Sequence, residues 1–157
     1  MMNRNNRGKA SEALVATALT ILKNRLEKKY KRGQHSNSVP LITNVVHAEP
    51  NSPLDRQKKD FVINFHGGQE VFLQVKSSER GRRKFNKICN RLGLSINVVV
   101  VDPNNDVVER VVHRLFMIIK QVFDTARRAI ASIRARTQRP VPKKRRQWCP
   151  RPRVWAY

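Results

Sequence analysis

Acidic residues are scarce in this 157-residue sequence, which has 11 Asp and Glu residues against 33 Lys and Arg. The formal net charge is therefore +22 at pH 7. Such an excess of positive charge is typical of proteins that bind polyanions, and nucleic acids are the expected partners. Hydrophobic residues still make up 39% of the chain and gather in runs, which is enough for one domain with its own core.

Long hydrophobic runs are absent too. No stretch approaches the roughly 18 apolar residues of a membrane-spanning helix, and residues 1–9 lack the apolar core of a signal peptide. The two cysteines, Cys89 and Cys149, form no Cys-x-x-Cys pair, so neither a zinc site nor a redox pair is expected. These features predict a cytoplasmic protein with free thiols and no membrane partner.

Several catalytic signatures are also missing. The sequence has no serine or cysteine nucleophile motif and no glycine-rich loop of the dinucleotide-binding or P-loop type. The four histidines lack metal-ligand spacing, and each is expected to be structural or solvated: His35, His47, His66 and His113. One segment, residues 60–76, holds most of the remaining candidates.

The spacing of apolar residues predicts the order helix, strand, two-stranded hairpin, helix, strand and helix. The ranges, in that order, are 11–30, 41–48, 60–65 with 70–76, 82–92, 96–101 and about 104–136. This is an α/β fold with a mixed sheet, in a single domain over residues 1–139. Residues 140–157 are rich in proline and arginine, show no periodicity and are expected to form a flexible basic tail.

Four finer expectations concern the packing of these elements. The run 96–101 is continuously apolar and is predicted to be a central strand, buried on both faces. The helix over 82–92 should bury Phe85, Ile88, Cys89 and Leu92. The final helix is expected to be capped by Asn104, Asn105 or Asp106 and to turn an apolar stripe inward. That stripe consists of Val108, Val111, Leu115, Ile118, Val122, Ala126, Ala129 and Ile133.

The hairpin over residues 60–76 holds the candidate chemistry. Because strand side chains alternate between faces, Gln74 and Lys76 share one face. Asp60 joins them only if the turn at Gly67-Gly68 has an odd number of residues or a bulge, which glycine allows because it adopts positive φ. A carboxylate, an amide oxygen and a lysine in this arrangement can hold a divalent cation beside water and phosphate. The alternative is that all three are ordinary solvent-facing residues.

Glu12 strengthens the functional interpretation. At about 100° per residue it lies in line with Leu19, Leu26 and Tyr30, on the stripe that the first helix turns toward the core. A buried carboxylate requires a cation or hydrogen bonds. The alternative is a carboxylate in the first helical turn that interacts with the helix dipole at the edge of the core. Asp55 is expected to be a turn residue rather than a second acid.

These residues, in this order, resemble the PD-(D/E)XK nuclease superfamily, which includes restriction enzymes and archaeal Holliday-junction resolvases. The resemblance rests on Glu12, on Asp60 within Asp-Phe-Val-Ile, and on Gln74 and Lys76 within Leu-Gln-Val-Lys-Ser-Ser. It covers roughly residues 8–101 and looks most like small members in which Gln replaces the middle acid. It implies a restriction-endonuclease-like core of one helix, three strands, a helix and a strand. The sequence departs from the family pattern at two positions. Lys59, rather than proline, precedes Asp60, and Gln74 supplies a neutral amide oxygen, which binds a hard cation less strongly than a carboxylate does.

The same resemblance implies a metal-dependent endonuclease that hydrolyses nucleic-acid phosphodiester bonds, with DNA as the expected substrate. Asp60, the Gln74 amide oxygen and the Val75 backbone carbonyl would bind Mg²⁺ or Mn²⁺. Lys76 would orient or help to deprotonate the attacking water. Glu12 would hold a metal-bound water, a second ion or Lys76 itself.

Basic residues supply candidate contacts to the nucleic-acid backbone. They lie on the polar side of the 82–92 helix and in the tail: Arg82, Arg83, Lys84, Lys87, Arg91, Lys143, Lys144, Arg145 and Arg146. Charge alone supports a binding protein without catalysis equally well. A third alternative is a ribosome-associated or packaging protein whose tail aromatics stack on RNA bases: Trp148, Trp155 and Tyr157. The apolar surface of the final helix also allows a homodimer.

Overall fold

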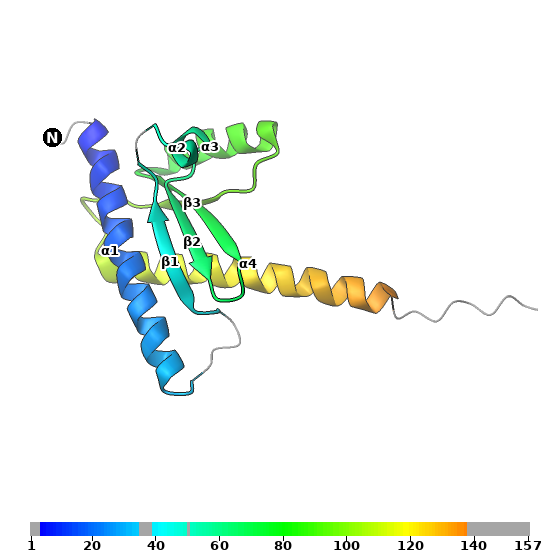
Figure 1. Cartoon of the computed structure of the whole chain (residues 1–157). Helices are drawn as coiled ribbons and strands as arrows, with labels where there is room; N and C mark the ends of the chain where they lie inside the picture. Colours follow the sequence, from blue (N-terminus) through cyan, green and yellow to red (C-terminus); the bar gives the residue numbers. More distant parts are fainter. Residues whose placement is uncertain (1–3, 35–38, 50, 138–157) are drawn as a thin grey trace, which may run out of the picture.

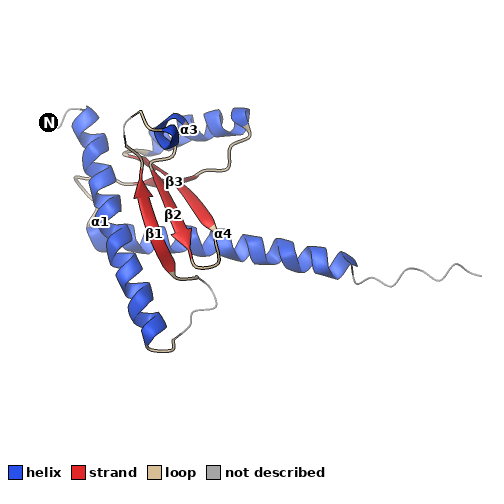
Figure 2. Cartoon of the chain, in the orientation of Figure 1, coloured by secondary structure: helices blue, strands red, loops and turns tan. Residues whose placement is uncertain are grey.

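The computed structural model describes residues 4–34, 39–49 and 51–137 of the chain. The elements are α1 (Arg4–Lys31), β1 (Ile42–His47), α2 (Pro53–Arg56), β2 (Phe61–Phe65), β3 (Glu70–Lys76), α3 (Glu79–Leu92), β4 (Asn97–Val100) and α4 (Val108–Thr137). The predicted mixed α/β fold and the order of its elements are confirmed, with the short α2 added between β1 and β2. Figure 2 shows the strands in the middle, with the helices around them.

The four strands form one mixed sheet in the order β1-β2-β3-β4. β2 is antiparallel to both β1 and β3, whereas β4 is parallel to β3. The predicted central position of residues 96–101 is wrong, because β4 lies at the edge of the sheet. Its run of valines reflects contact with α3 and with α4, rather than a strand on each side. At the edge, Arg114 Nη1 donates a 2.9 Å hydrogen bond to the Val100 carbonyl.

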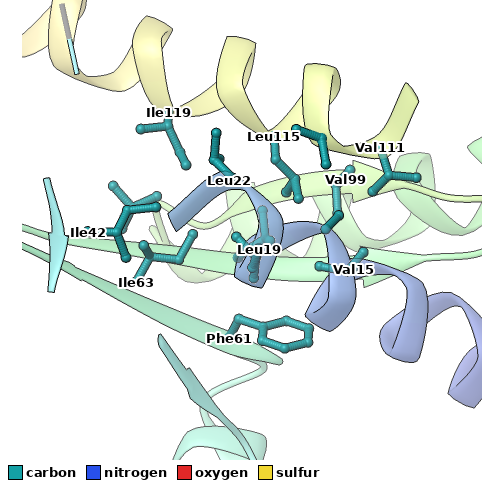
Figure 3. Packing of buried hydrophobic residues seen from close by; sticks show 14 of the residues in the cluster. Val15, Leu19, Leu22, Ile42, Phe61, Ile63, Val99, Val111, Leu115 and Ile119 are labelled. Carbon is teal, nitrogen blue, oxygen red and sulfur yellow. The ribbon is translucent and has the colours of Figure 1, made fainter. Parts of the chain in front are cut away.

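One face of the sheet packs against α1 and α4 and forms the hydrophobic core (Figure 3). Alternate residues of β2 and β3 point into it, and Phe61, Ile63 and Leu73 are at most 1% exposed. Leu19 of α1 and Leu115 of α4 belong to the same cluster and are fully buried. The apolar residues that recur at helical spacing along α1 therefore pack against the alternate apolar residues of the strands, in one layer.

α3 lies next to β3 and β4, on the side of the sheet away from that core. Phe85 and Cys89 are buried, as predicted. Ile88 and Leu92 are exposed, which corrects the predicted stripe. The cause is geometric, because α3 rests on only two strands and they cover a narrow strip of its surface.

Two helices begin earlier than predicted. α1 starts at Arg4 rather than at residue 11, and Gly33, with φ of +70°, ends it as expected. α3 starts at Glu79 rather than at residue 82, because Ser78 Oγ caps it by accepting a hydrogen bond from a backbone amide. Ser78, which the sequence pattern placed in a loop, is therefore the N-cap of this helix.

α4 begins at Val108, so the predicted caps Asn104, Asn105 and Asp106 lie ahead of it, in the preceding turn. The Asp106 carboxylate instead accepts 2.8 Å hydrogen bonds from the Asp102 amide and from Arg114 Nη1. A charged guanidinium is a stronger partner for this carboxylate than the helix amides would be.

The predicted stripe of α4 is buried only in the first part of the helix. Two of its members are fully buried and three are partly buried: Val111, Leu115, Val108, Ile118 and Val122. Three members are exposed, in contrast to the prediction: Ala126, Ala129 and Ile133. The cause is length, because the 30-residue α4 continues past the sheet and its last turns project from the body (Figure 1).

The predicted tail, residues 140–157, lies outside the described residues, together with Lys143, Lys144, Arg145 and Arg146. In the part that is described, no helix is long and apolar enough to cross a membrane. Cys89 is a free, buried thiol.

The two parts of α4 offer a matched pair of substitutions. Ile119 is 1% exposed and Ile133 is 61% exposed. Ile119→Ala removes buried methylene groups and leaves a cavity, so we expect the free energy of unfolding to fall by about 2–5 kcal/mol. Ile133→Ala should change it by less than about 0.5 kcal/mol. Urea denaturation of both variants measures the difference, and equal losses would show that the end of α4 is packed in solution.

Candidate active site

The turn of the β2–β3 hairpin decides which side chains share a face. Phe65 N donates a 2.9 Å hydrogen bond to Gln69 O, and the three residues 66–68 lie between them. Both glycines of this turn have positive φ. Of the two conditions that would let Asp60 join Gln74 and Lys76, an odd-length turn or a bulge, the structure has the odd-length turn. The register that follows pairs Phe61 with Leu73. One residue further along, Asp60 and Gln74 lie on one face, where their side chains are hydrogen-bonded.

Asp60 is fixed by β3. Its Oδ2 accepts a 2.7 Å hydrogen bond from the Val75 amide and a second, short one from Gln74 Nε2. Its own amide donates 2.9 Å to the Leu73 carbonyl. Gln74 is 6% exposed and presents its amide nitrogen, not its oxygen, to Asp60. Both of these hydrogen bonds end on Oδ2 rather than on Oδ1.

The Val75 carbonyl lies on the same edge of β3 as Asp60. The Leu73 carbonyl faces β2, where it accepts from Asp60, while the Lys76 carbonyl faces the other way and accepts from Val101 N at 2.8 Å. Successive carbonyls of a strand point to opposite edges, so those of Leu73 and Val75 point to the same edge. The Val75 carbonyl, which is the expected backbone ligand of a metal ion, therefore points to the edge of β3 at which Asp60 lies.

Glu12 reaches the same end of the sheet from α1. Its neighbour Ser11 is fully buried and donates a 2.9 Å hydrogen bond to the Val101 carbonyl, which ties α1 to the segment after β4. The Glu12 side chain is 36% exposed, so it lies at the edge of the core rather than within it. The alternative interpretation is therefore right about the edge of the core. It is wrong about the first helical turn, because α1 begins at Arg4 and the dipole effect falls off within one turn.

His47 lies next to Glu12 in the site, whereas it was expected to be structural or solvated. It is the last residue of β1, and its ring stacks on Phe61 at a centroid distance of 4.5 Å. Its Nε2 lies 3.7 Å from Glu12 Oε2. Pairing of β1 with β2 brings it beside Asp60, whose carbonyl accepts a 2.8 Å hydrogen bond from Ala48. Only the register of β1 places this histidine near the carboxylates.

Lys76 ends β3 and points toward α3. Its Nζ lies 4.9 Å from the centroid of the Phe85 ring. Burial lowers the pKa of Lys76, although the carboxylates of Asp60 and Glu12 raise it. The ammonium form is therefore less favoured here than in water.

The two carboxylates are both disfavoured in their charged forms. Burial raises the pKa of Glu12 and the Asp60 carboxylate raises it further, against the opposing effects of His47 and Lys76. Burial also raises the pKa of Asp60, more than the Val75 amide and Lys76 lower it. A cation bound between them would favour the ionised form of both.

The oxygen donors at this site suit a hard divalent cation such as Mg²⁺ or Mn²⁺. They are the carboxylates of Asp60 and Glu12 and the carbonyl of Val75. The Gln74 amide oxygen would join them only after the amide group turns over. Over the described ranges, no group of three His, Cys, Asp or Glu residues is placed to hold a metal ion. A cation here would therefore need backbone and amide oxygens in addition to the two carboxylates.

The predicted basic face of α3 adjoins the site, because α3 begins shortly after Lys76. Four of its five members are exposed: Arg83, Lys84, Lys87 and Arg91. Arg82 is partly buried and its Nε donates 2.8 Å to Glu79 Oε2. The exposed four are thus free to reach an anion in solution.

Asp55 takes a structural role in α2. Its Oδ2 accepts a 2.9 Å hydrogen bond from the Asn51 amide, and its own amide donates to the cap residue Ser52. The expected turn role is confirmed.

Comparisons with protein-family models, with curated proteins and with solved structures find no match to the chain. The resemblance to PD-(D/E)XK nucleases therefore depends on the residues themselves and on an α/β fold with a four-stranded mixed sheet flanked by helices.

Asp60→Asn should stabilise the fold at neutral pH. The asparagine oxygen can accept both hydrogen bonds that Oδ2 accepts, while the charge is removed. The pKa of Asp60 in the folded state lies above its ordinary value of 3.8. The wild type therefore loses stability as the pH rises from 3.8 through this raised pKa. The advantage of Asp60→Asn should therefore be largest at neutral pH and vanish below pH 3.8, where the carboxyl is protonated in both states.

Urea denaturation of the wild type and of Asp60→Asn at neutral and at acid pH measures this dependence. A lower unfolding midpoint for the variant at neutral pH would contradict the picture of a carboxylate that is held at a cost to stability.

Proposed function

We propose that the protein is a metal-dependent endonuclease that hydrolyses nucleic-acid phosphodiester bonds, with DNA as its main substrate. The observation that carries the proposal is the position of the Asp60 carboxylate at one end of the sheet, where it accepts hydrogen bonds from the Val75 amide and Gln74 Nε2. Lys76 follows on β3, and Glu12 of α1 lies at the same end, 3.7 Å from His47. Carboxylates with raised pKa values next to a lysine with a lowered pKa are typical of reaction centres. Membership of the PD-(D/E)XK superfamily, in its Gln-x-Lys form, is part of the same proposal.

Mg²⁺ or Mn²⁺ is the proposed cofactor. Asp60, Glu12 and the Val75 carbonyl would hold it, and the Gln74 oxygen would contribute after the amide turns over. When bound, such an ion supplies Lewis-acid polarisation of a phosphate oxygen and lowers the pKa of water. A neutral amide in place of a third acid weakens this set of ligands, so the affinity for the ion is expected to be modest.

The side chains of the chain itself have separate roles in this proposal. Lys76 would orient the attacking water and help to remove its proton, since burial lowers its pKa, and its charged form would offset the negative charge on the phosphorane. Glu12 would hold Lys76 or a water in position. The Val75 amide and the Gln74 side chain orient Asp60.

The exposed basic face of α3 is the proposed contact for the substrate backbone, and Lys143, Lys144, Arg145 and Arg146 are proposed as further contacts. Affinity for nucleic acid would then fall steeply with salt, because lysine and arginine displace condensed counterions. We propose a cytoplasmic location, where a free thiol such as that of Cys89 stays reduced.

A nucleic-acid-binding protein without catalysis is the second candidate. Arg127, Arg128 and Arg134 are exposed at the projecting end of α4, which favours a binding role for that segment. Ile130 and Ile133 are exposed on the same turns, so a second copy of the chain is also a candidate partner there. The RNA-associated alternative depends on the tail aromatics, which lie outside the described residues.

Cleavage assays with duplex, branched and single-stranded DNA, and with RNA, test the proposal directly. We expect at least one substrate to be cut in Mg²⁺ or Mn²⁺ and none to be cut in EDTA. Lys76→Met removes the group that positions the water and should lower the cleavage rate by about 100-fold or more. Lys31→Met, at the far end of α1, is the matched control and should cleave at the wild-type rate.

Two outcomes would contradict the nuclease proposal: no cleavage of any substrate in the presence of a metal ion, or wild-type cleavage by Lys76→Met. Calorimetric titration with Mn²⁺ separates the two candidates further. Nucleic-acid binding without ion binding favours the non-catalytic protein, whereas ion binding that is lost in Asp60→Asn favours the nuclease.

A further inference from the structure

The strand β4 has an open edge. In the described part of the chain it pairs with a strand on one side only, which is β3. The Val101 amide donates a 2.8 Å hydrogen bond to the Lys76 carbonyl and so points toward β3. Because successive residues of a strand turn their backbone groups to opposite edges, those of Val98 and Val100 point away from β3. The Val100 carbonyl agrees with this direction, since it accepts from Arg114 of α4 rather than from β3.

A groove of about 730 Å³ runs along this open edge, between the start of α3 and the first half of α4. Val98 and Val100 line it and are only partly buried. On the side of α4 the groove is bordered by Met117, which is 48% exposed, and by Ile118. An open strand edge beside exposed apolar side chains can add a further strand through backbone hydrogen bonds.

Charge is balanced in this groove, in contrast to the chain as a whole. Basic residues outnumber acidic ones by 33 to 11 in the sequence. The groove is lined by three carboxylates and three guanidinium groups: Glu79, Asp102, Asp106, Arg82, Arg110 and Arg114. A polyanion therefore finds no excess of positive charge here. A second copy of this basic chain meets a neutral surface, where the acids of one copy can face the arginines of the other.

We propose that this groove is a homodimer interface in which β4 pairs antiparallel with β4 of a second copy. A two-fold axis at Val99 sets Val98 opposite Val100 of the second copy, and Val100 opposite its Val98. These are the residues whose backbone groups point outward, so each pair can exchange N–H···O=C bonds. The Val100 carbonyl has a second lone pair beside its bond to Arg114. The edge is thus complementary to itself, as a two-fold contact requires.

Three substitutions separate this interface from the other exposed apolar surface, the projecting end of α4. Val98→Pro removes an amide that points away from β3, and proline is tolerated on an edge strand in that position. Met117→Lys adds a like charge beside the groove. Ile133→Lys is its matched control, since Ile133 is also exposed on α4 but lies on the projecting end. Circular dichroism at low protein concentration checks the fold, and Met117→Lys carries the test if Val98→Pro does not fold.

Sedimentation equilibrium of the full chain, freed of nucleic acid, measures the association. The wild type and Ile133→Lys should have the mass of two chains, and Val98→Pro should have the mass of one. Met117→Lys should weaken the dimer by about tenfold or more, because like charges then face each other. The affinity of the wild type for itself should rise with salt, which screens the repulsion between two chains of charge +22.

Several results of this measurement would overturn the proposal. One is a monomeric wild type, and another is a Val98→Pro variant that dimerises like the wild type. Dissociation of Ile133→Lys with Met117→Lys unchanged would place the interface on the projecting end of α4 instead. A dimer that dissociates as salt is added would be held by ion pairs or by bound nucleic acid, and not by strand pairing.

Amide hydrogen exchange identifies what covers the edge. The Val98 and Val100 amides should be protected at high protein concentration and exchange rapidly on dilution, while those of Val99 and Val101, which point toward β3, stay protected at both. Protection of Val98 and Val100 at every concentration would mean that another segment of the same chain covers the edge, and would contradict the dimer. Neither measurement uses a substrate, so the result does not depend on the nuclease proposal.

Discussion

The hydrogen bond from the Val75 amide to the Asp60 carboxylate is the contact on which the candidate active site depends. It exists because the hairpin turn has three residues, which sets Asp60 on the same face as Gln74. A register shifted by one residue would move one strand's side chains to the other face of the sheet. The same register sends Phe61 and Leu73 into the core. One constraint therefore separates the side chains that stabilise the fold from those that gather at the site.

Charged groups from other elements converge on this fixed point. α1 brings Glu12, next to the buried Ser11, and β1 brings His47, whose Nε2 lies 3.7 Å from Glu12 Oε2. The chain has only 11 acidic residues against 33 basic ones, yet two partly buried carboxylates lie at this end of the sheet, where the charge of Asp60 raises the pKa of Glu12. A local pair of carboxylates within a strongly basic protein suits a site where a cation and a polyanion are bound together.

Local patterns were sufficient for the element order and for part of the site. Alternation along β3 predicted that Gln74 and Lys76 share a face, and the paired glycines allowed Asp60 to join them. Helical spacing predicted Glu12 on the inward stripe of the first helix, within the core or at its edge. The edge position of β4 could not be predicted. An apolar run indicates that both faces of a strand are covered, but it does not indicate whether another strand lies on each side. The exposed end of α4 was not predicted, because the apolar stripe of a helix does not indicate where the sheet and helix that it packs against end. His47 could not be predicted from local patterns, because only the pairing of β1 with β2 brings it to the site.

Broadening of amide signals by Mn²⁺ in isotope-labelled protein tests the central claim most directly, since it locates the ion without requiring any catalysis. The account predicts that the amides of Glu12, Asp60 and Val75 broaden first, that those of Gly67 and Gly68 at the other end of the hairpin stay sharp, and that Asp60→Asn abolishes the effect. Broadening centred on other acids, such as Glu79 or Glu109, and unchanged in Asp60→Asn would contradict it.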